Sequence, residues 1–313
     1  MIQISHSHLY TAALTHPGMG GRPNEDRFAI LAFRLSSENP TPSVFAIVSD
    51  GIGGHRAGEV AAEMAVEQIC QIVAQSDAGN PLAILQQAIQ TAGQNIALRA
   101  QGDTQMQGMG TTCACAWVIG TQLYIASVGD SRIYLLRQGR LRQLTVDHTW
   151  VQEAIEKGFL SPEQAVNHIN QHVIRRYLGS SKPPQADIRL KLATEETDTQ
   201  ARANQGMSLW PNDVILLCTD GLTDVVSDEQ IETVLRNTKD VQHAAHQLID
   251  LACQRQGRDN ITALLLKMPS LSPTRTLPWK NWITIGAAVL LALAFLVLFF
   301  AWLVFRVILP PTG

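Results

Sequence analysis

The sequence lacks a surplus of charge of either sign. Its 313 residues include 24 Lys and Arg against 27 Asp and Glu, so the formal net charge is only -3. Domains that bind nucleic acid carry basic surfaces, and this balance therefore indicates no nucleic-acid partner. Charged residues make up 16% of the chain, below the roughly 25% typical of soluble proteins. An apolar run near the C-terminus accounts for part of that deficit.

The first residues also lack a basic start followed by an apolar run, so they predict no secretory signal. Its cysteines are few and irregularly spaced, so they predict free thiols in a reducing compartment and no disulfide framework. Cys113 and Cys115 would share one face of a strand, but the further ligands that a zinc site needs are not evident. No cysteine lies in a tight phosphate-binding loop of the kind that cysteine phosphatases use. The five cysteines are Cys70, Cys113, Cys115, Cys218 and Cys253.

One long apolar segment, residues 283–305, carries no charge. At about 1.5 Å per residue a helix of this length crosses a bilayer core of about 30 Å. Tryptophans near its ends favour the membrane interface. The alternative is a buried core helix, but such helices are rarely apolar on every face over this length. We therefore predict a single transmembrane helix that binds membrane lipid.

The segment before it is rich in Pro, Ser and Thr and is typical of an extended linker. The predicted organisation is a catalytic domain over residues 1–268, a linker over 269–282, the transmembrane helix over 283–305 and a short tail over 306–313. Basic residues are more numerous before the span than after it, which places the domain in the cytoplasm.

Within residues 1–268, β-rich runs are clustered and do not alternate strictly with helices. This arrangement favours antiparallel sheets with helices packed outside them over a doubly wound parallel sheet. The predicted strands cover 28–33, 44–48, 113–119, 123–128, 133–136, 214–217 and 261–266, and the predicted helices cover 59–73, 82–99, 229–235 and 244–254.

Four aspartates are placed alike relative to these runs. Asp50, Asp130 and Asp220 each end a β-rich run, and Asp259 stands just before one. Because the end of an antiparallel strand lies beside the start of its neighbour, we expect these carboxylates to converge on one edge. Such carboxylates repel one another unless a cation is present, and oxygen ligands suit Mg²⁺ or Mn²⁺ better than zinc. Any one of them alone is also typical of a turn after a strand.

Glycines follow Asp50 where the chain passes from strand to helix, and they allow close approach to a ligand or metal. A dinucleotide-binding loop is not indicated. After Gly51 and Gly53 the third position of that motif is Arg56, and the alternating strand–helix frame is missing.

Six short motifs occur in order within residues 10–267. They are Asn24-Glu25-Asp26, Ser49-Asp50-Gly51-Ile52-Gly53-Gly54-His55, Met109-Gly110-Thr111-Thr112, Val128-Gly129-Asp130-Ser131-Arg132, Thr219-Asp220-Gly221 and Arg258-Asp259-Asn260. Each alone is weak evidence, but six in order are strong. The series resembles that of the metal-dependent protein phosphatases of type 2C in their bacterial serine/threonine form. Residues 168–179 resemble the stretch that follows this family's mobile flap.

The resemblance implies an α+β fold, a four-layer αββα sandwich of two antiparallel sheets flanked by helices. It also implies two Mn²⁺ or Mg²⁺ ions with a weaker third. Asp50 would bridge two ions, the Gly51 carbonyl would ligate one, and Asp220 and Asp259 would ligate directly. Glu25 and Asp26 would hold metal-bound water or complete an outer coordination shell. Asp130 would bind the third ion together with Asp220, and Arg22 would bind the substrate phosphate.

The implied activity is hydrolysis of phosphoserine and phosphothreonine in protein substrates of a serine/threonine kinase pathway, by a metal-activated water. Two departures from the family pattern affect the site. Ile52 occupies the position where eukaryotic members carry a histidine proposed as general acid, which leaves His55 or metal-bound water as the candidate donor. Arg22 stands one residue closer to Asn24 than the family pattern expects.

Two other functions compete with this one. A small-molecule metal phosphohydrolase would use the same motifs, because substrate size cannot be read from them. A membrane-tethered binding module with a decayed site is the second, and the complete set of four aspartates argues against it.

Overall fold

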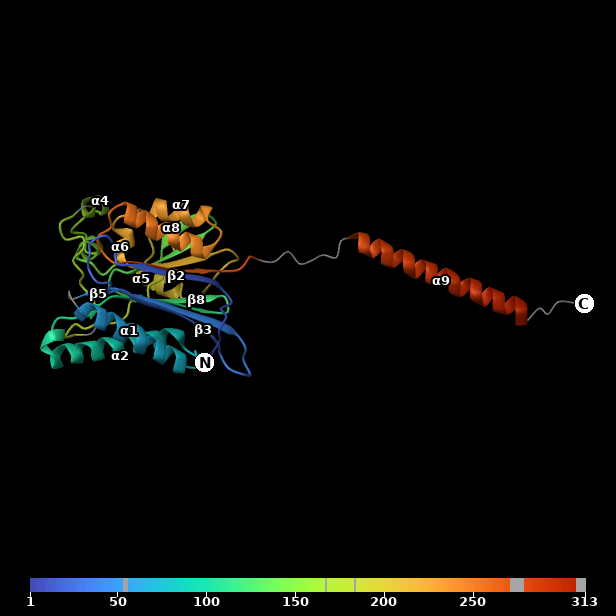
Figure 1. The fold of residues 1–313 in the computed structure, drawn as a ribbon, viewed down its shortest axis with the longest axis horizontal. Helices are drawn as coiled ribbons and strands as arrows, with labels where there is room; N and C mark the ends of the chain where they lie inside the picture. Colours follow the sequence, from blue (N-terminus) through green and yellow to red (C-terminus); the bar gives the residue numbers. More distant parts are fainter. Residues whose placement is uncertain (53–55, 167, 183, 271–278, 308–313) are drawn as a thin grey trace, which may run out of the picture. The chain divides into compact units, whose positions relative to one another are not determined.

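The computed structural model describes residues 1–52, 56–166, 168–182, 184–270 and 279–307 (Figure 1). The chain divides into two compact units, Met1–Pro269 and Ser270–Gly313. Most of the predicted linker, together with Gly53, Gly54 and His55, lies outside the described residues.

The first sheet of the larger unit is antiparallel throughout and has the order β1-β3-β4-β7-β8-β11. In β4 the side chains of Phe45 and Ile47 face one apolar cluster, whereas Val44, Ala46 and Val48 face another. This alternation explains why the strand is apolar at almost every position, since both of its faces are buried. The strands are β1 (Ile2–Gln3), β3 (Arg27–Arg34), β4 (Pro42–Ser49), β7 (Cys113–Ile119), β8 (Gln122–Val128) and β11 (Met207–Ser208).

The second sheet is also antiparallel, in the order β10-β9-β12-β13-β2. Ile215 and Leu217 of β12 pack with Val44 and Val48 of the first sheet in one buried cluster, so the two sheets lie face to face. The strands are β2 (Tyr10–His16), β9 (Arg132–Arg137), β10 (Arg140–Gln143), β12 (Val214–Cys218) and β13 (Ile261–Lys267).

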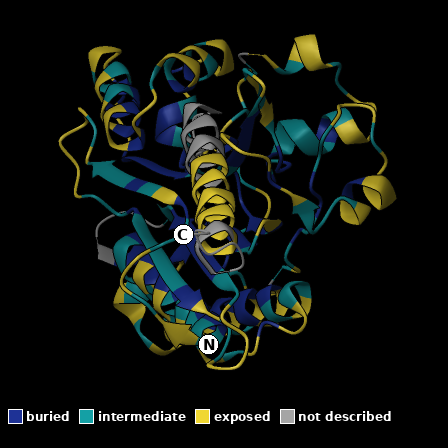
Figure 2. Cartoon of the chain, turned by 90° about the vertical axis from the view of Figure 1, so that its right-hand side faces the viewer, coloured by how far each residue is buried: buried dark blue, intermediate teal, exposed yellow. Residues whose placement is uncertain are grey.

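Long helices cover the two outer faces. The helices α1 (Arg56–Gln75) and α2 (Pro81–Gly102) pack on the first sheet, and α7 (Asp228–Asn237) and α8 (Val241–Gln254) pack on the second (Figure 1). Figure 2 shows the buried residues concentrated in the central strands and on the inward sides of these helices. The prediction of two antiparallel sheets between helices is confirmed.

Shorter elements connect these layers. A two-stranded ribbon joins β5 (Gly51–Ile52) to β6 (Gly110–Thr111) next to the start of α1. A 3-10 turn spans Thr104–Met106, and short helices form at α3 (Trp150–Glu156), α4 (Pro162–Ala165), α5 (Asp198–Ala203) and α6 (Asp220–Thr223).

In the smaller unit, the described residues after Ser270 form the helix α9 (Trp279–Val307). Its side chains are described for residues 290–304, and all of these are exposed. Among the described residues, no helix meets the combined requirement of length and apolarity for crossing a membrane. The structure therefore does not support the transmembrane helix predicted at 283–305, of which residues 283–289 and 305 have side chains outside the described set.

Candidate metal centre

The topology brings the predicted aspartates to one edge of the sandwich. Both β4 and β8 pair antiparallel with β7, so they run in the same direction and end at the same edge, where Asp50 and Asp130 follow them. In the second sheet β12 and β13 are antiparallel neighbours, so the end of β12, before Asp220, lies beside the start of β13, after Asp259. Each sheet thus contributes two carboxylates.

Asp26 joins the two sheets. It precedes β3 of the first sheet and is only 2% exposed. Its Oδ2 accepts hydrogen bonds from the hydroxyls of Thr219 at 2.9 Å and Thr262 at 2.6 Å, both from the second sheet. Its Oδ1 is buried and has no hydrogen-bond partner among the described residues.

Burial and mutual repulsion raise the pKa values of these carboxyls. Burial, followed by the charges of Asp26, Asp220 and Asp130, raises the pKa of Asp50 well above its ordinary value. Burial is likewise the main cause for Asp26, whose pKa rises to about 7, with Asp220 and Asp259 adding to it. The pKa values of Asp130 and Asp220 are raised for the same reasons. A protein that buries four interacting carboxylates needs either protons or cations there.

The unpartnered oxygens show that the residues fit a cation. Oδ1 of Asp26, Oδ1 of Asp130 and Oδ1 of Asp220 are all buried without a hydrogen-bond partner among the residues that the structure describes. Buried polar atoms in native proteins are almost always satisfied. An all-oxygen donor set suits Mg²⁺ or Mn²⁺.

Neighbouring hydroxyls and glycines fix Asp50. Its amide donates to Oγ1 of Thr112 at 2.9 Å, and its carbonyl accepts from Oγ1 of Thr111 at 2.7 Å. A Cβ on Gly51 would lie 2.4 Å from the carbonyl oxygen of Gly58 and 2.9 Å from that of Glu25, so only glycine allows this approach. The backbone of Glu25 therefore lies beside Gly51.

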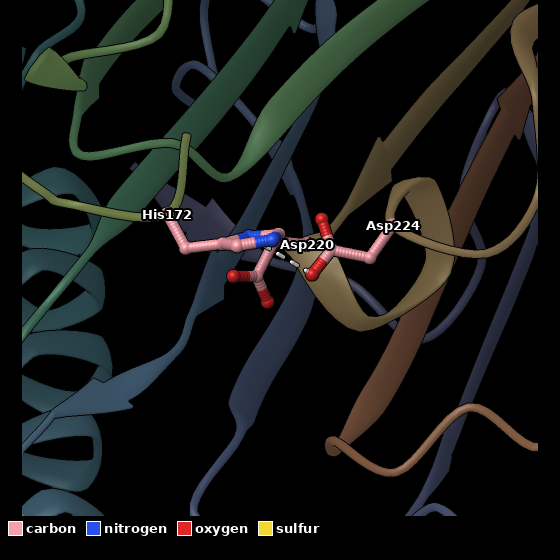
Figure 3. A group of neighbouring side chains, drawn as sticks. All are labelled: His172, Asp220 and Asp224. Atoms are coloured by element: carbon pink, nitrogen blue, oxygen red, sulfur yellow. Dashed lines mark ion pairs between the residues drawn. The ribbon is translucent and has the colours of Figure 1, made fainter. Parts of the chain in front are cut away.

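A histidine and a further carboxylate, to which the sequence had assigned no role, also reach the centre. His172 Nδ1 lies 3.3 Å from Asp224 Oδ2, and with Asp220 they place three possible ligand atoms within 4.8 Å of one another (Figure 3). Burial and the charge of Asp220 raise the pKa of Asp224 to about 6. The sequence signal that could have identified Asp224 is its spacing of four residues from Asp220, because residues four apart share a helix face.

Arg22 lies in a loop that is tied to the Asp259 segment. The Asn260 amide donates to the carbonyls of Pro17 at 3.2 Å and Pro23 at 3.1 Å, which are the two ends of that loop. Arg22 and Asp259 line the same cavity of about 390 Å³. Ile52, at the position of the eukaryotic histidine, lies in β5, and the candidate donor His55 falls outside the described residues.

Comparison with known proteins gives a consistent result. Residues 19–261 match the family described as protein phosphatase 2C. The chain is 36% identical over 234 residues to the serine/threonine phosphatase stp of Listeria welshimeri, an alignment that covers 74% of this chain and 86% of that protein.

Solved structures agree with this assignment. The crystal structure of the Mycobacterium tuberculosis serine/threonine phosphatase PstP/Ppp matches with a TM-score of 0.69 at 32% identity, covering 83% of this chain and 99% of that one. The catalytic domain of the phosphatase PstP in complex with two manganese ions matches with a TM-score of 0.67 at 31% identity, covering 83% and 97%. The chain therefore belongs to the protein phosphatase 2C family of serine/threonine phosphatases.

Proposed function

We propose that this protein hydrolyses phosphoserine and phosphothreonine in proteins at a centre of two divalent cations, Mn²⁺ or Mg²⁺, with a weaker third. The observation that carries the proposal is the convergence of carboxylates from both sheets around buried oxygens that lack a hydrogen-bond partner within the described ranges of the chain. A purely structural cluster of this kind would instead pair its carboxylates with Arg or Lys.

The ligand assignment follows the motif series. Asp50, shared between the two principal ions, would hold them together with Asp220 and Asp259. Asp130 and Asp220 would hold the third ion, and Asp224 and His172 lie close enough to Asp220 to contribute to it. The Gly51 carbonyl, Glu25 and Asp26 complete the set, the last two through water or in an outer shell.

When bound, the cations supply Lewis-acid chemistry by lowering the pKa of a water molecule and neutralising phosphate charge. The chain's own residues do the positioning. Arg22 holds the phosphate with its planar fork of donors, Thr111 and Thr112 fix the backbone of Asp50, and Thr219 and Thr262 orient Asp26. No protein nucleophile is required.

Phosphate release from a phosphothreonine peptide, with Mn²⁺ and with EDTA, tests this function. We expect turnover with Mn²⁺ and none with EDTA. A protein that hydrolyses p-nitrophenyl phosphate but no phosphopeptide would be a small-molecule phosphohydrolase. A protein that binds Mn²⁺ but hydrolyses neither substrate would be a decayed binding module.

We further propose that residues 283–305 anchor the protein in a membrane, with residues 1–268 as a cytoplasmic catalytic domain that acts on substrates of a serine/threonine kinase. The uncharged sequence of this segment supports the proposal, as do the exposed apolar side chains of 290–304. Burying them in lipid at about 1.5–3 kcal/mol each exceeds what a surface attachment provides. Carbonate washing of membranes should leave the full chain in the pellet, and its release would refute the anchor.

A further inference from the structure

Two arginines share the cavity beside the metal centre. Arg22 and Arg258 line this space of about 390 Å³ together with Asp259, Met19 and Gly20. Neither guanidinium makes a hydrogen bond or an ion pair with any residue in the described part of the chain. Arg132, another arginine near the acidic cluster, is by contrast held by Asp147, with Nη2 2.7 Å from Oδ2. The two cavity arginines are therefore free to bind an anion.

The backbone fixes the two arginines relative to each other. The Met19 amide donates to the Gly257 carbonyl at 2.7 Å. A Cβ on Gly18 would lie 1.9 Å from the carbonyl oxygen of Asp259, and one on Gly20 would lie 2.2 Å from that of Arg258. Only glycine permits this packing at positions 18 and 20. Because the backbones of the two loops are held together before any ligand arrives, a ligand that uses both arginines does not have to order these loops.

The size of the cavity argues for more than one anionic group. Pockets that hold whole small ligands span about 300–1,000 Å³, and a single phosphoryl group leaves most of this cavity empty. Arg22 is assigned to the phosphate under attack. Arg258 then stands beside it with a planar fork of donors that matches a carboxylate.

We propose that Arg258 is a specificity-determining residue that selects phosphoproteins with an acidic side chain next to the phosphorylated residue. This inference rests on the proposed function, because it presupposes that the metal centre hydrolyses phosphopeptides. Arg258 binds the carboxylate of the neighbouring side chain, while Arg22 holds the phosphate.

The test uses the full-length protein with Mn²⁺ and a set of phosphothreonine peptides. In each pair a single Glu or Gln stands at one of the positions flanking the phosphothreonine, so that the members differ only in charge. We expect the wild type to prefer Glu at one of these positions by about fivefold in kcat/KM, which corresponds to about 1 kcal/mol. The preference should weaken as salt is added.

Three variants separate the explanations. Arg258→Gln should lose the preference, and Arg258→Lys should keep part of it, because lysine retains the charge without the fork. The control, Arg34→Gln, makes the same change in net charge at the opposite end of β3 from Asp26, and it should keep the full preference. Circular dichroism of each variant checks that it is folded.

The outcomes decide between this inference and its alternatives. A wild type without a Glu preference would overturn it. An equal loss on Glu and Gln peptides in Arg258→Gln would also overturn it, because Arg258 would then hold the phosphate under attack. Absence of hydrolysis of every peptide by the wild type with Mn²⁺ would instead refute the proposed function.

Discussion

Ionisation of the buried carboxyl groups at the metal centre should make the metal-free protein less stable as the pH rises. Asp26 is the best-defined case, because it is buried and burial raises its pKa to about 7. The folded chain therefore holds this proton more tightly than the unfolded chain, where the pKa of Asp is about 3.9. The resulting stability is fully present below the unfolded pKa and is lost as the pH rises through about 4 to 7.

The difference between the folded and unfolded pKa values corresponds to about 4 kcal/mol in the free energy of unfolding, all of which is lost at pH values above both. Between pH 5 and pH 8 the part due to Asp26 is about 3 kcal/mol. Asp26→Asn removes this titration, and its amide oxygen can still accept the hydrogen bonds of Thr219 and Thr262. The substitution also removes one of the charges that repel Asp50. This second effect likewise makes the free energy of unfolding of the variant depend less on pH.

The measurement is urea unfolding between pH 5 and pH 8 in EDTA. The free energy of unfolding of the wild type should fall by about 3 kcal/mol more than that of Asp26→Asn. Asp250→Asn changes the same charge at an exposed position of α8 and should follow the wild type. With saturating Mn²⁺ the extra loss should disappear, because cations favour the ionised carboxylates. Parallel curves for wild type and Asp26→Asn in EDTA would refute the reasoning.

The remaining predictions concern catalysis. Removing divalent cations with EDTA should abolish phosphopeptide turnover, and Mn²⁺ or Mg²⁺ should restore it; a requirement for zinc would contradict the oxygen ligand set. Alanine at Asp50, Asp220 or Asp259 should lower kcat by more than the roughly 10–100-fold typical of losing an outer-shell partner, with folding intact by circular dichroism, and a near-normal rate would exclude that residue as a ligand. Arg22→Ala should chiefly raise KM, because Arg22 holds phosphate in the ground state and the transition state alike; an unchanged KM would place it outside the site.

The strands in the middle of the sheets were predictable because they are buried on both faces. The run at 44–48 became β4 with three further residues, and the run at 113–119 became β7 with the same bounds. The strand β2 (Tyr10–His16) was not predicted; it lies at an edge of the second sheet and is only half-buried. An edge strand has one neighbour and a weaker apolar pattern, so periodicity identifies it poorly.

The acidic cluster was predictable for a different reason. Aspartates at strand ends need only the strand directions to be brought together, and antiparallel pairing supplies those. The partners of Asp26 were not predictable, because Thr219 and Thr262 are 193 and 236 residues away in sequence. His172 likewise reaches Asp224 from a segment with no regular structure. Such contacts depend on how the two sheets face each other, which no local pattern encodes.

The distribution of the carboxylates over both sheets links metal binding to folding. Asp50 and Asp130 belong to the first sheet, and Asp220 and Asp259 belong to the second, so a cation held by members of both sets bridges the sandwich. The hydrogen bonds of Asp26 to the second sheet are the protein's own link at the same edge. Because the unfolded chain has no such preformed site, binding energy at this edge adds to the stability of the packed sheets. The repulsion expected to destabilise the metal-free protein at neutral pH would thus also favour binding of divalent cations by the folded sandwich.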